Sequence, residues 1–271
     1  MDKEKAKAEK ILFFRSQAQE YHFTREYNKA ASFYIRAGLL GDLESIRTIC
    51  LRMKNGYGMG YNFDEFFRCM QIGANAGIAD AMYELGVCYS NGIGTEPDTK
   101  EAMHWFSEGA KAGSKEARRS FWSYNYDFIV RIMDDTQPFS YDIRKTVFVD
   151  EQGFTDEPDQ DEHDADAKHF VMFDGSRAVA TCRLYWDEAH ATYILGRFAV
   201  LKEYRGIGVG SEIMDQVIAY VKSVKGKSVS LHAQLSAKAF YERFGFAAEG
   251  EPDEEQGQPH IWMHRRFPIY V

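Results

Sequence analysis

The stretch LKEYRGIGVGSEIMDQVIAY (201–220) has glycine at positions 206, 208 and 210, between two segments of different periodicity. The segment before it, HATYILGRFAVL (190–201), is mostly apolar and β-rich, which is typical of a central strand. The segment after it predicts a helix, because apolar residues recur at helical spacing at Ile213, Met214, Val217, Ile218 and Val221. Glycines before a helix N-terminus let a diphosphate approach the unpaired amides there, so the pattern predicts a phosphorylated cofactor.

Two common phosphate-binding motifs fit this loop poorly. A dinucleotide fingerprint G-x-G-x-x-G would need its third glycine at position 211, where the sequence has Ser211. The G-K-[ST] triplet of a P-loop does not occur here. The pattern R-x-x-G-x-G, formed by Arg205, Gly208 and Gly210, does fit. A glycine loop that serves only as a tight turn remains the alternative.

The first half of the chain repeats itself. The segment GYGMGYNFDEFFRCMQIGANAG (56–77) aligns without a gap on GIGTEPDTKEAMHWFSEGAKAG (92–113), at a shift of 36 residues. A further step of 36 leads back to Gly41, which indicates a third and more degenerate copy. A fixed period of this size is typical of a solenoid.

Each copy reads as a pair of helices. In ADAMYELGVCYSNG (79–92) apolar residues share one helical stripe, and Gly92 can adopt the left-handed conformation that ends a helix. We expect the second helix to start at Asp98, with Glu101 three residues later as in a capping box, and the previous copy has Asn62 and Glu65 at the matching positions.

The elements L-G-x-x-Y, N-G-x-G and A-x-x-W of these copies resemble the SEL-like repeats, relatives of the tetratricopeptide repeats. The resemblance covers about residues 5–120 and weakens toward the N-terminus. It implies protein contacts through a concave surface. The alternative is that so short a solenoid serves mainly to pack against the rest of the chain.

Composition narrows the class of protein. The net charge is −8, and residues 124–271 hold 25 acidic against 16 basic residues, which argues against general nucleic-acid binding. No run approaches the roughly 20 apolar residues that span a membrane, and the start MDKEKAKAEKILFF is too polar for a signal peptide. We therefore expect a cytoplasmic protein whose four cysteines are reduced and buried. A bridge among Cys50, Cys69 and Cys88 is the alternative.

A second stretch, LHAQLSAKAFYERFGF (231–246), predicts the end of a strand, a short helix and a turn into another strand. The loop R-G-x-G-x-G followed by A-x-x-F-Y-x-x-x-G-F resembles the paired signature of the GNAT superfamily of acetyl-CoA-dependent N-acetyltransferases. VFVDEQGF (147–154), HF (169–170) and QPHIWMHR (258–265) resemble its ElaA-type branch. The resemblance covers about residues 125–267 and implies acetyl-CoA as cosubstrate, with no metal.

The resemblance also implies residue roles for cofactor binding. Acetyl-CoA would lie between two parallel strands that splay apart, at about 193–201 and 228–233. Its pantetheine arm would pair with the backbone around Phe198, Ala199 and Val200, and an amide near Val200 would polarise the thioester carbonyl. The pyrophosphate would be held by the loop amides and the Arg205 guanidinium, with Gln234 replacing the family's usual asparagine on the pantetheine side. The loop residues are Arg205, Gly206, Ile207, Gly208, Val209, Gly210 and Ser211.

Catalysis needs a proton donor and a proton acceptor. Tyr241 stands at the position of the family's tyrosine, which protonates the departing CoA thiolate; alternatively it is a core residue beside Phe240 and Phe244. The general base that deprotonates the amine is less certain, and we rank Glu151 and His260 ahead of His169 and His232. No covalent intermediate is expected. Cys182 lies in the strand-like run VATCRLYW, and we expect it to be buried and not to act as a nucleophile.

The segment DEQGFTDEPDQDEHDAD (150–166) is strongly acidic. A solvated loop is the simplest interpretation. Calcium binding is an alternative, but the EF-hand order of ligands is absent. In the implied fold this segment borders the acceptor entrance, so we hypothesise that it steers a cationic acceptor: a polyamine, an aminosugar or a lysine peptide. Its nine carboxylates are Asp150, Glu151, Asp156, Glu157, Asp159, Asp161, Glu162, Asp164 and Asp166.

The sequence thus predicts an α+β protein of two domains. Residues 1–122 would form a solenoid of helix pairs with period 36, and residues 123–271 a GNAT acetyltransferase domain with a splayed central sheet. The enzyme would transfer acetyl to a primary amine by direct attack in a ternary complex, and the repeats would bind a partner or substrate. The rival hypothesis is a repeat-based interaction scaffold whose second domain only senses CoA or is inactive. The sequence specifies no oligomeric state.

Overall fold

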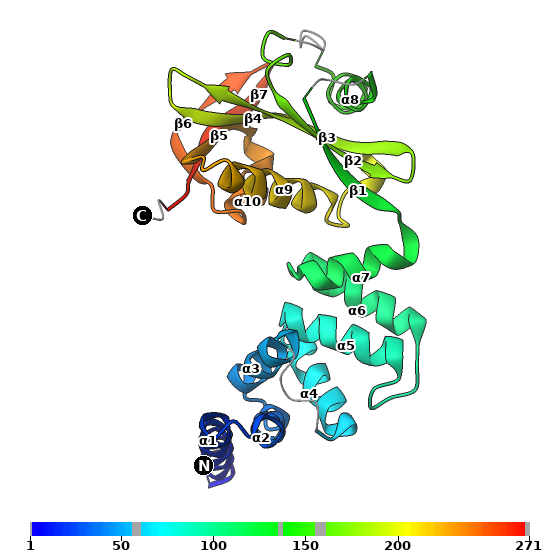
Figure 1. Ribbon diagram of the computed structural model, residues 1–271, viewed down its shortest axis with the longest axis vertical. Helices are drawn as coiled ribbons and strands as arrows, with labels where there is room; N and C mark the ends of the chain where they lie inside the picture. Colours follow the sequence, from blue (N-terminus) through cyan, green and yellow to red (C-terminus); the bar gives the residue numbers. More distant parts are fainter. Residues whose placement is uncertain (1, 56–60, 135–137, 155–160, 269–271) are drawn as a thin grey trace. The chain divides into compact units, whose positions relative to one another are not determined.

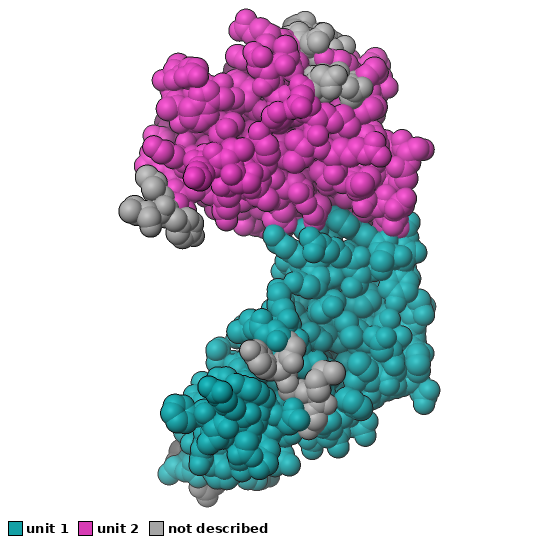
Figure 2. Space-filling view, in the orientation of Figure 1, with its two compact units in different colours: residues 1–125 teal, residues 126–271 magenta. Residues whose placement is uncertain are grey.

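The computed structural model describes residues 2–55, 61–134, 138–154 and 161–268. It divides into two compact units, residues 1–125 and 126–271, which Figure 2 draws in teal and magenta. The boundary expected after residue 122 falls inside the last helix of the first unit. None of the described helices has an apolar stretch long enough to span a membrane.

The described part of the first unit is helical, as expected. After α1 (Asp2–Phe23), two sets of helices alternate along the chain (Figure 1). One set starts at residues 27, 63 and 99, and the other at residues 43, 79 and 115, so both repeat at the period of 36. The degenerate first copy is therefore confirmed as a helix pair. The first set is α2 (Tyr27–Leu39), α4 (Phe63–Asn75) and α6 (Thr99–Lys111), and the second is α3 (Leu43–Lys54), α5 (Ala79–Asn91) and α7 (Lys115–Asn125).

The predicted helix ends are confirmed. The Asp98 carboxylate accepts hydrogen bonds from the amides of Lys100 and Glu101, and Asn62 accepts one from Glu65. The reciprocal bond of a capping box is not formed at Asp98, because its own amide donates to the Tyr89 carbonyl at 2.8 Å. Gly92 ends α5 in the left-handed conformation, with φ of 70°.

The repeated glycines allow close packing of helices. A Cβ at Gly73 would lie 2.6 Å from the Ile46 side chain, and one at Gly109, one repeat later, would lie 2.8 Å from Ala117. Ile46 and Ala117 belong to the helix set that starts at 43 and 115, so each glycine seats one set against the other. All four cysteines are buried and unbridged, as expected.

The second unit is built on one mixed sheet. Its strand order is β1-β2-β3-β4-β5-β7-β6, and all neighbours are antiparallel except the parallel pair β4–β5. Figure 1 shows α8 (Pro138–Arg144) on one face, and α9 (Val209–Ser223) and α10 (Lys238–Glu242) on the other. The strands are β1 (Phe128–Met133), β2 (Lys168–Asp174), β3 (Arg177–Asp187), β4 (Thr192–Val200), β5 (Ser228–Gln234), β6 (Ala247–Glu255) and β7 (Gln258–Arg266).

The two parallel strands separate along their length. β4 and β5 pair only at Tyr193–Val229 and Ile194–Ser230, near their starts. Beyond this point β5 stays paired with β7 and β4 stays paired with β3. The predicted splayed centre of the sheet is thus present, and it opens toward the carboxyl ends of both strands.

Candidate functional site

The glycine loop follows the open end of β4. Gly206 and Gly208 have φ of 75° and 89°, a left-handed conformation that residues with a Cβ rarely adopt. Gly208 is the N-cap of α9, and a glycine has no side chain to cap the first amides of the helix. Those amides belong to Val209, Gly210 and Ser211 and lack acceptors within the helix. The loop can therefore accept an anion at the start of α9.

Gly210 has a different role from the other two glycines. It is helical, and a Cβ there would lie 3.5 Å from the rings of both Phe198 and Phe240. That distance is an ordinary van der Waals contact, so Gly210 leaves room beside these rings rather than relieving a clash. Two of the three glycines are thus explained by backbone conformation, whereas a small side chain would fit at position 210.

A β-bulge shapes the end of β4. The register with β3 passes from Arg183–Gly196 to Thr181–Ala199, so Arg197 and Phe198 together oppose one residue. Arg197 has φ of 52°, a strained value for a residue with a Cβ. The bulge bends the strand where it leaves β5. It places the buried Ala199 and the half-buried Phe198 and Val200 on the wall of the opening.

Tyr241 lies on α10 and is buried against this wall. Its ring makes edge contacts with Phe198 and Phe240, at centroid distances of 6.2 and 5.1 Å. Burial raises the pKa of the Tyr241 phenol, and the nearby Cys182 raises it further, so the hydroxyl stays protonated. No residue that the structure describes forms a hydrogen bond with this hydroxyl. Tyr241 thus combines the expected core contacts with a hydroxyl that is able to donate.

Arg205 and Glu151 form a bidentate ion pair. Arg205 donates to both carboxylate oxygens of Glu151, at 2.5 and 2.8 Å, and its Nε donates to the Val200 carbonyl at 2.8 Å. Glu151 ends the π-helical turn that follows α8. The hydrogen bonds from Arg205 lower the pKa of Glu151. A lowered pKa makes a carboxylate a weaker base, so the pair favours a positioning role for Glu151.

The two predicted residues Gln234 and His260 are direct neighbours across the β5–β7 ladder. Gln234 Nε2 donates to Oε1 of Gln152 at 2.8 Å, which brings this ladder next to Glu151. The His260 Nδ1 lies 2.9 Å from the Gln258 carbonyl oxygen. Because a carbonyl only accepts, Nδ1 carries the hydrogen in this contact and Nε2 keeps a lone pair. His260 is therefore in the tautomer that can accept a proton.

The two lower-ranked histidines, His232 and His169, form hydrogen bonds with other residues of the second unit. His232 places Nδ1 2.7 Å from Glu255 and Nε2 2.8 Å from Asp253, and its ring stacks on Trp262. His169 is fully buried, and burial lowers its pKa. Its Nε2 lies 2.9 Å from the Asp164 carbonyl oxygen. His169 is therefore a core residue, whereas the ring of His232 lies 5.1 Å from that of His260.

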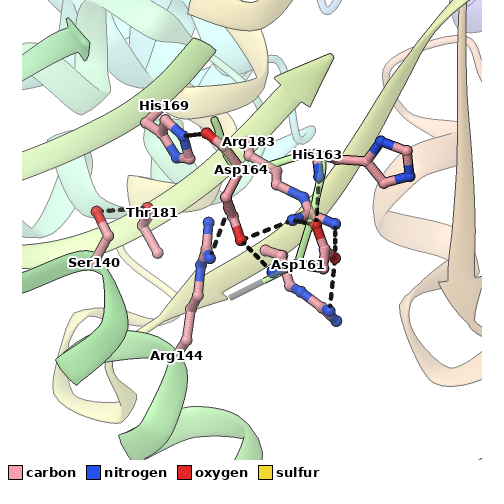
Figure 3. Close-up of polar contacts among 9 residues, drawn as sticks. Ser140, Arg144, Asp161, His163, Asp164, His169, Thr181 and Arg183 are labelled. Atoms are coloured by element: carbon pink, nitrogen blue, oxygen red, sulfur yellow. Dashed lines mark hydrogen bonds and ion pairs between the residues drawn. The ribbon is translucent and has the colours of Figure 1, made fainter. Parts of the chain in front are cut away.

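Part of the acidic segment is buried in an arginine network, which corrects the expectation of a solvated loop (Figure 3). Asp164 is 1% exposed; it pairs with Arg144 at 3.0 Å and with Arg183 at 3.0 Å. Asp161 receives a bidentate pair from Arg183, at 2.5 and 2.6 Å, and a contact from Arg197 at 3.2 Å. These two carboxylates hold the chain against β3 and β4 because buried guanidinium groups need counter-charges. Residues 155–160 of the segment, Asp159 among them, lie outside the described residues.

The sequence interpretation missed this network. Its signal is Arg183 inside the apolar run VATCRLYW, because a charge in a buried strand requires a partner. The partners stand about 20 residues earlier in a segment that reads as solvent-exposed, so spacing alone could not assign them. Cys182 is buried and burial raises its pKa, which supports the expectation that it is no nucleophile.

Comparison with known proteins assigns a family to the second unit and identifies one repeat in the first. A family profile described as an acetyltransferase (GNAT) domain matches residues 135–267, and a Sel1 repeat profile matches residues 79–114. A Bacillus subtilis protein provisionally named an acetyltransferase is 33% identical over 130 residues, which are 47% of this chain and 87% of that protein. Protein ElaA of Escherichia coli is 33% identical over 126 residues, which are 45% of this chain and 82% of ElaA. The crystal structure of Escherichia coli ElaA superposes with a TM-score of 0.48 and 27% identity, over 52% of this chain and 100% of that one.

Proposed function

The chain belongs through its C-terminal unit to the GNAT acetyltransferase family, and on that premise we propose that it transfers an acetyl group from acetyl-CoA to a primary amine. The observation that carries this proposal is the opening between β4 and β5, which has the glycine loop at one end and the buried Tyr241 on its wall. The amine attacks the thioester carbonyl directly, in a ternary complex.

The residues around the opening fit acetyl-CoA. The amides at the start of α9 suit the pyrophosphate, since Gly206 and Gly208 supply the backbone conformation that turns them outward. The bulge exposes the β4 backbone near Phe198 and Val200 for pairing with the pantetheine arm, and an amide there would polarise the thioester carbonyl. Arg205, held by Glu151, sits beside Val200, and Gln234 lines the β5 side. Bound acetyl-CoA supplies the activated acetyl group.

The proton movements are assigned to two side chains. His260 accepts the proton that the ammonium group must lose, directly or through water, because its Nε2 carries the lone pair. Tyr241 donates a proton to the departing thiolate, since burial keeps its phenol protonated. Glu151 orients Arg205 rather than accepting the substrate proton, since its lowered pKa leaves little basicity. This assignment replaces the equal ranking of Glu151 and His260.

A cationic acceptor is the proposed substrate class: a polyamine, an aminosugar or a lysine-bearing peptide. Support comes from β6, where Glu249, Glu251, Asp253, Glu254 and Glu255 are all exposed, and β6 pairs with the strand that holds His260. Asp161 and Asp164 cannot serve in steering, since arginines neutralise them. Among the described residues, long-range attraction of the amine therefore rests on the exposed acids of β6, together with Glu162 and Asp166.

The rival function is a scaffold whose second unit binds CoA without turnover. Tyr241 is the feature that argues against it, because a sensor needs no protonated phenol on the wall of the opening. The two functions are separated by thiol release from acetyl-CoA in the presence of polyamines, aminosugars, amino acids and lysine peptides. Release that depends on the amine supports the enzyme. Calorimetric binding of CoA with no release on any of these amines would support the sensor.

A further inference from the structure

Arg183 is a buried guanidinium with one nitrogen that lacks an acceptor. The residue is 6% exposed, and its two terminal nitrogens pair with Asp161 and Asp164. Its Nε is also buried, and it has no hydrogen-bond partner in the described part of the chain. A buried N–H group without an acceptor costs free energy comparable to a lost hydrogen bond. Such a group on β3, beside the strand that lines the opening, points to an acceptor atom supplied by a ligand.

Gly196 keeps the space next to this nitrogen open. It stands directly opposite Arg183 in the ladder between β3 and β4. Apart from its chain neighbours, a Cβ at Gly196 would have one described atom within 4 Å, and that atom is Arg183 Nε at 3.8 Å. Gly196 is half-buried, so the space borders solvent. Because any other residue would fill this space with its own side chain, glycine leaves room for a small group beside Nε.

Gly196 and the proposed base His260 lie on the same face of the sheet. Opposite residues of neighbouring strands share a face, and so do residues two apart on one strand. Gly196 is two residues from Ile194, which pairs with Ser230 on β5. Gln234 is four residues beyond Ser230 and pairs with His260 on β7. An acceptor that presents its amine to His260 can therefore extend across the opening to Gly196.

The charges around Arg183 favour an anionic group in this space. Among the described residues, the network in Figure 3 joins three guanidinium groups to two carboxylates. Burial lowers the pKa of Arg197, and the positive charge of Arg144 lowers it further. The guanidinium groups belong to Arg144, Arg183 and Arg197, and the carboxylates to Asp161 and Asp164.

We propose that the acceptor carries a carboxylate, which binds beside Gly196 and accepts the hydrogen bond of Arg183 Nε. This inference rests on the proposed acetyl transfer and narrows its acceptor to an amino acid of the lysine type, which keeps a net positive charge. The exposed acids of β6 attract its ammonium groups, and the arginine network binds its carboxylate through a charge-assisted hydrogen bond. A polyamine has no carboxylate and lacks this contact.

The test compares L-lysine with cadaverine, which is the same diamine without the carboxylate. Amine-dependent thiol release from acetyl-CoA by the full chain gives kcat/KM for each, at about 150 mM salt so that exposed acids favour the more charged cadaverine little. We expect lysine to exceed cadaverine at least about tenfold, as for one charge-assisted hydrogen bond. Equal values for the two amines would overturn the carboxylate site while acetyl transfer stands. A lack of release with every amine would contradict acetyl transfer itself.

L-lysinamide separates charge from shape, because it keeps the carbonyl oxygen of lysine without the negative charge. We expect its kcat/KM to fall to about the level of cadaverine. A lysinamide value equal to that of lysine would contradict an anionic ligand. Both comparisons use the wild-type chain, so they do not depend on how a variant folds.

Gly196→Ala locates the site. Gly196 is not among the residues with positive φ, so its backbone accepts alanine, and the new Cβ fills the space beside Arg183 Nε. We expect the lysine-to-cadaverine ratio of kcat/KM to fall to less than about threefold. Gly210→Ala, the same change in the cofactor loop, should alter kcat/KM for both amines alike and keep the ratio. An unchanged ratio in Gly196→Ala, or an equal fall in both variants, would overturn the site.

Discussion

The ion pair between Arg205 and Glu151 determines what each side chain can do. Arg205 is fixed by three hydrogen bonds, two to Glu151 and one to the Val200 carbonyl. Glu151 is therefore paired with the Arg205 guanidinium, which lowers the pKa of its carboxylate. A carboxylate in this state is a weak base, whereas the tautomer of His260 with its hydrogen on Nδ1 has a lone pair on Nε2.

We therefore expect His260→Gln to lower kcat about 100-fold and Glu151→Gln to change it less than about threefold. Glu151→Gln should instead raise KM for acetyl-CoA, because Arg205 loses its orientation. Steady-state kinetics with both substrates varied gives this comparison. The loss of kcat in His260→Gln relative to wild type should become smaller as the pH rises toward the pKa of the amine, because a neutral amine needs no base. A larger loss of kcat in Glu151→Gln than in His260→Gln would reverse the assignment.

Glu84, a buried residue of α5, makes stability depend on pH in an unusual direction. Its folded pKa of about 7 is higher than the ordinary value of 4.5, so the folded state binds the proton more tightly than the unfolded state. The contribution of protonated Glu84 to stability is fully present below the unfolded pKa, and it is lost as the pH rises through about 7. This difference between the folded and the unfolded pKa of Glu84 corresponds to roughly 3 kcal/mol in the free energy of unfolding.

Glu84→Gln should therefore stabilise the repeat unit at about pH 8 and have little effect at about pH 5. Thermal unfolding followed by circular dichroism at both pH values measures the difference. The exposed Glu96→Gln serves as control. A Glu84→Gln protein that is less stable than wild type at the higher pH would show that the ionised carboxylate has a stabilising partner.

At the scale of elements, the segment before β2 is held by buried charge. Asp164 is enclosed by Arg144 and Arg183, which are themselves buried. Burial acts to raise the pKa of Asp164, but the two guanidinium groups outweigh it and the pKa is lowered. The carboxylate is thus ionised in the folded state, and it keeps the segment against the sheet.

Asp164→Asn should lower the free energy of unfolding of the second unit by about 3–5 kcal/mol, because two buried guanidinium groups lose their counter-charge. Urea unfolding gives the value, and Asp166→Asn, an exposed neighbour, should change it by less than about 0.5 kcal/mol. Equal effects of the two substitutions would show that the network contributes no net stability.

These elements differ in how far the sequence could predict them. The repeat helices follow from local signals, since their starts recur every 36 residues and their caps at Asn62, Asp98 and Gly92 lie within the copies. The strand, glycine loop and helix around Gly208 are equally local. The pairing of Arg183 with Asp161 depends on the tertiary fold, because Asp161 stands in a charge run that reads as solvent-exposed and 22 residues separate the two. The burial of Glu84 depends on the tertiary fold as well. The expectation of a solvated loop was wrong at Asp161 and Asp164 for this reason.

At the scale of the whole molecule, negative charge is concentrated in the second half. Residues 124–271 hold 25 acidic and 16 basic residues, and the exposed acids of β6 are among them. A cationic acceptor is attracted by this charge at low ionic strength. We expect kcat/KM for spermidine to fall about tenfold between about 20 and about 200 mM salt, as exposed charges become screened.

The double substitution Glu251→Gln and Glu254→Gln should lower kcat/KM for spermidine at low salt and flatten this dependence. Initial rates over a salt series give both slopes. The two residues lie at exposed positions of β6, so folding should be unaffected. If the salt dependence of kcat/KM stayed unchanged, the acids of β6 would not attract the acceptor. The proposal of a cationic amine substrate would then lose this support.

We propose that the second unit catalyses acetyl transfer with Tyr241 as proton donor. The most direct measurement is amine-dependent thiol release from acetyl-CoA by wild type, Tyr241→Phe and Tyr220→Phe, with CoA affinity measured in parallel. Tyr220 lies on α9 and serves as the matched control. We predict that Tyr241→Phe lowers kcat by at least about tenfold with unchanged CoA affinity, while Tyr220→Phe stays within about twofold of wild type. Equal kcat for wild type and Tyr241→Phe would contradict the account.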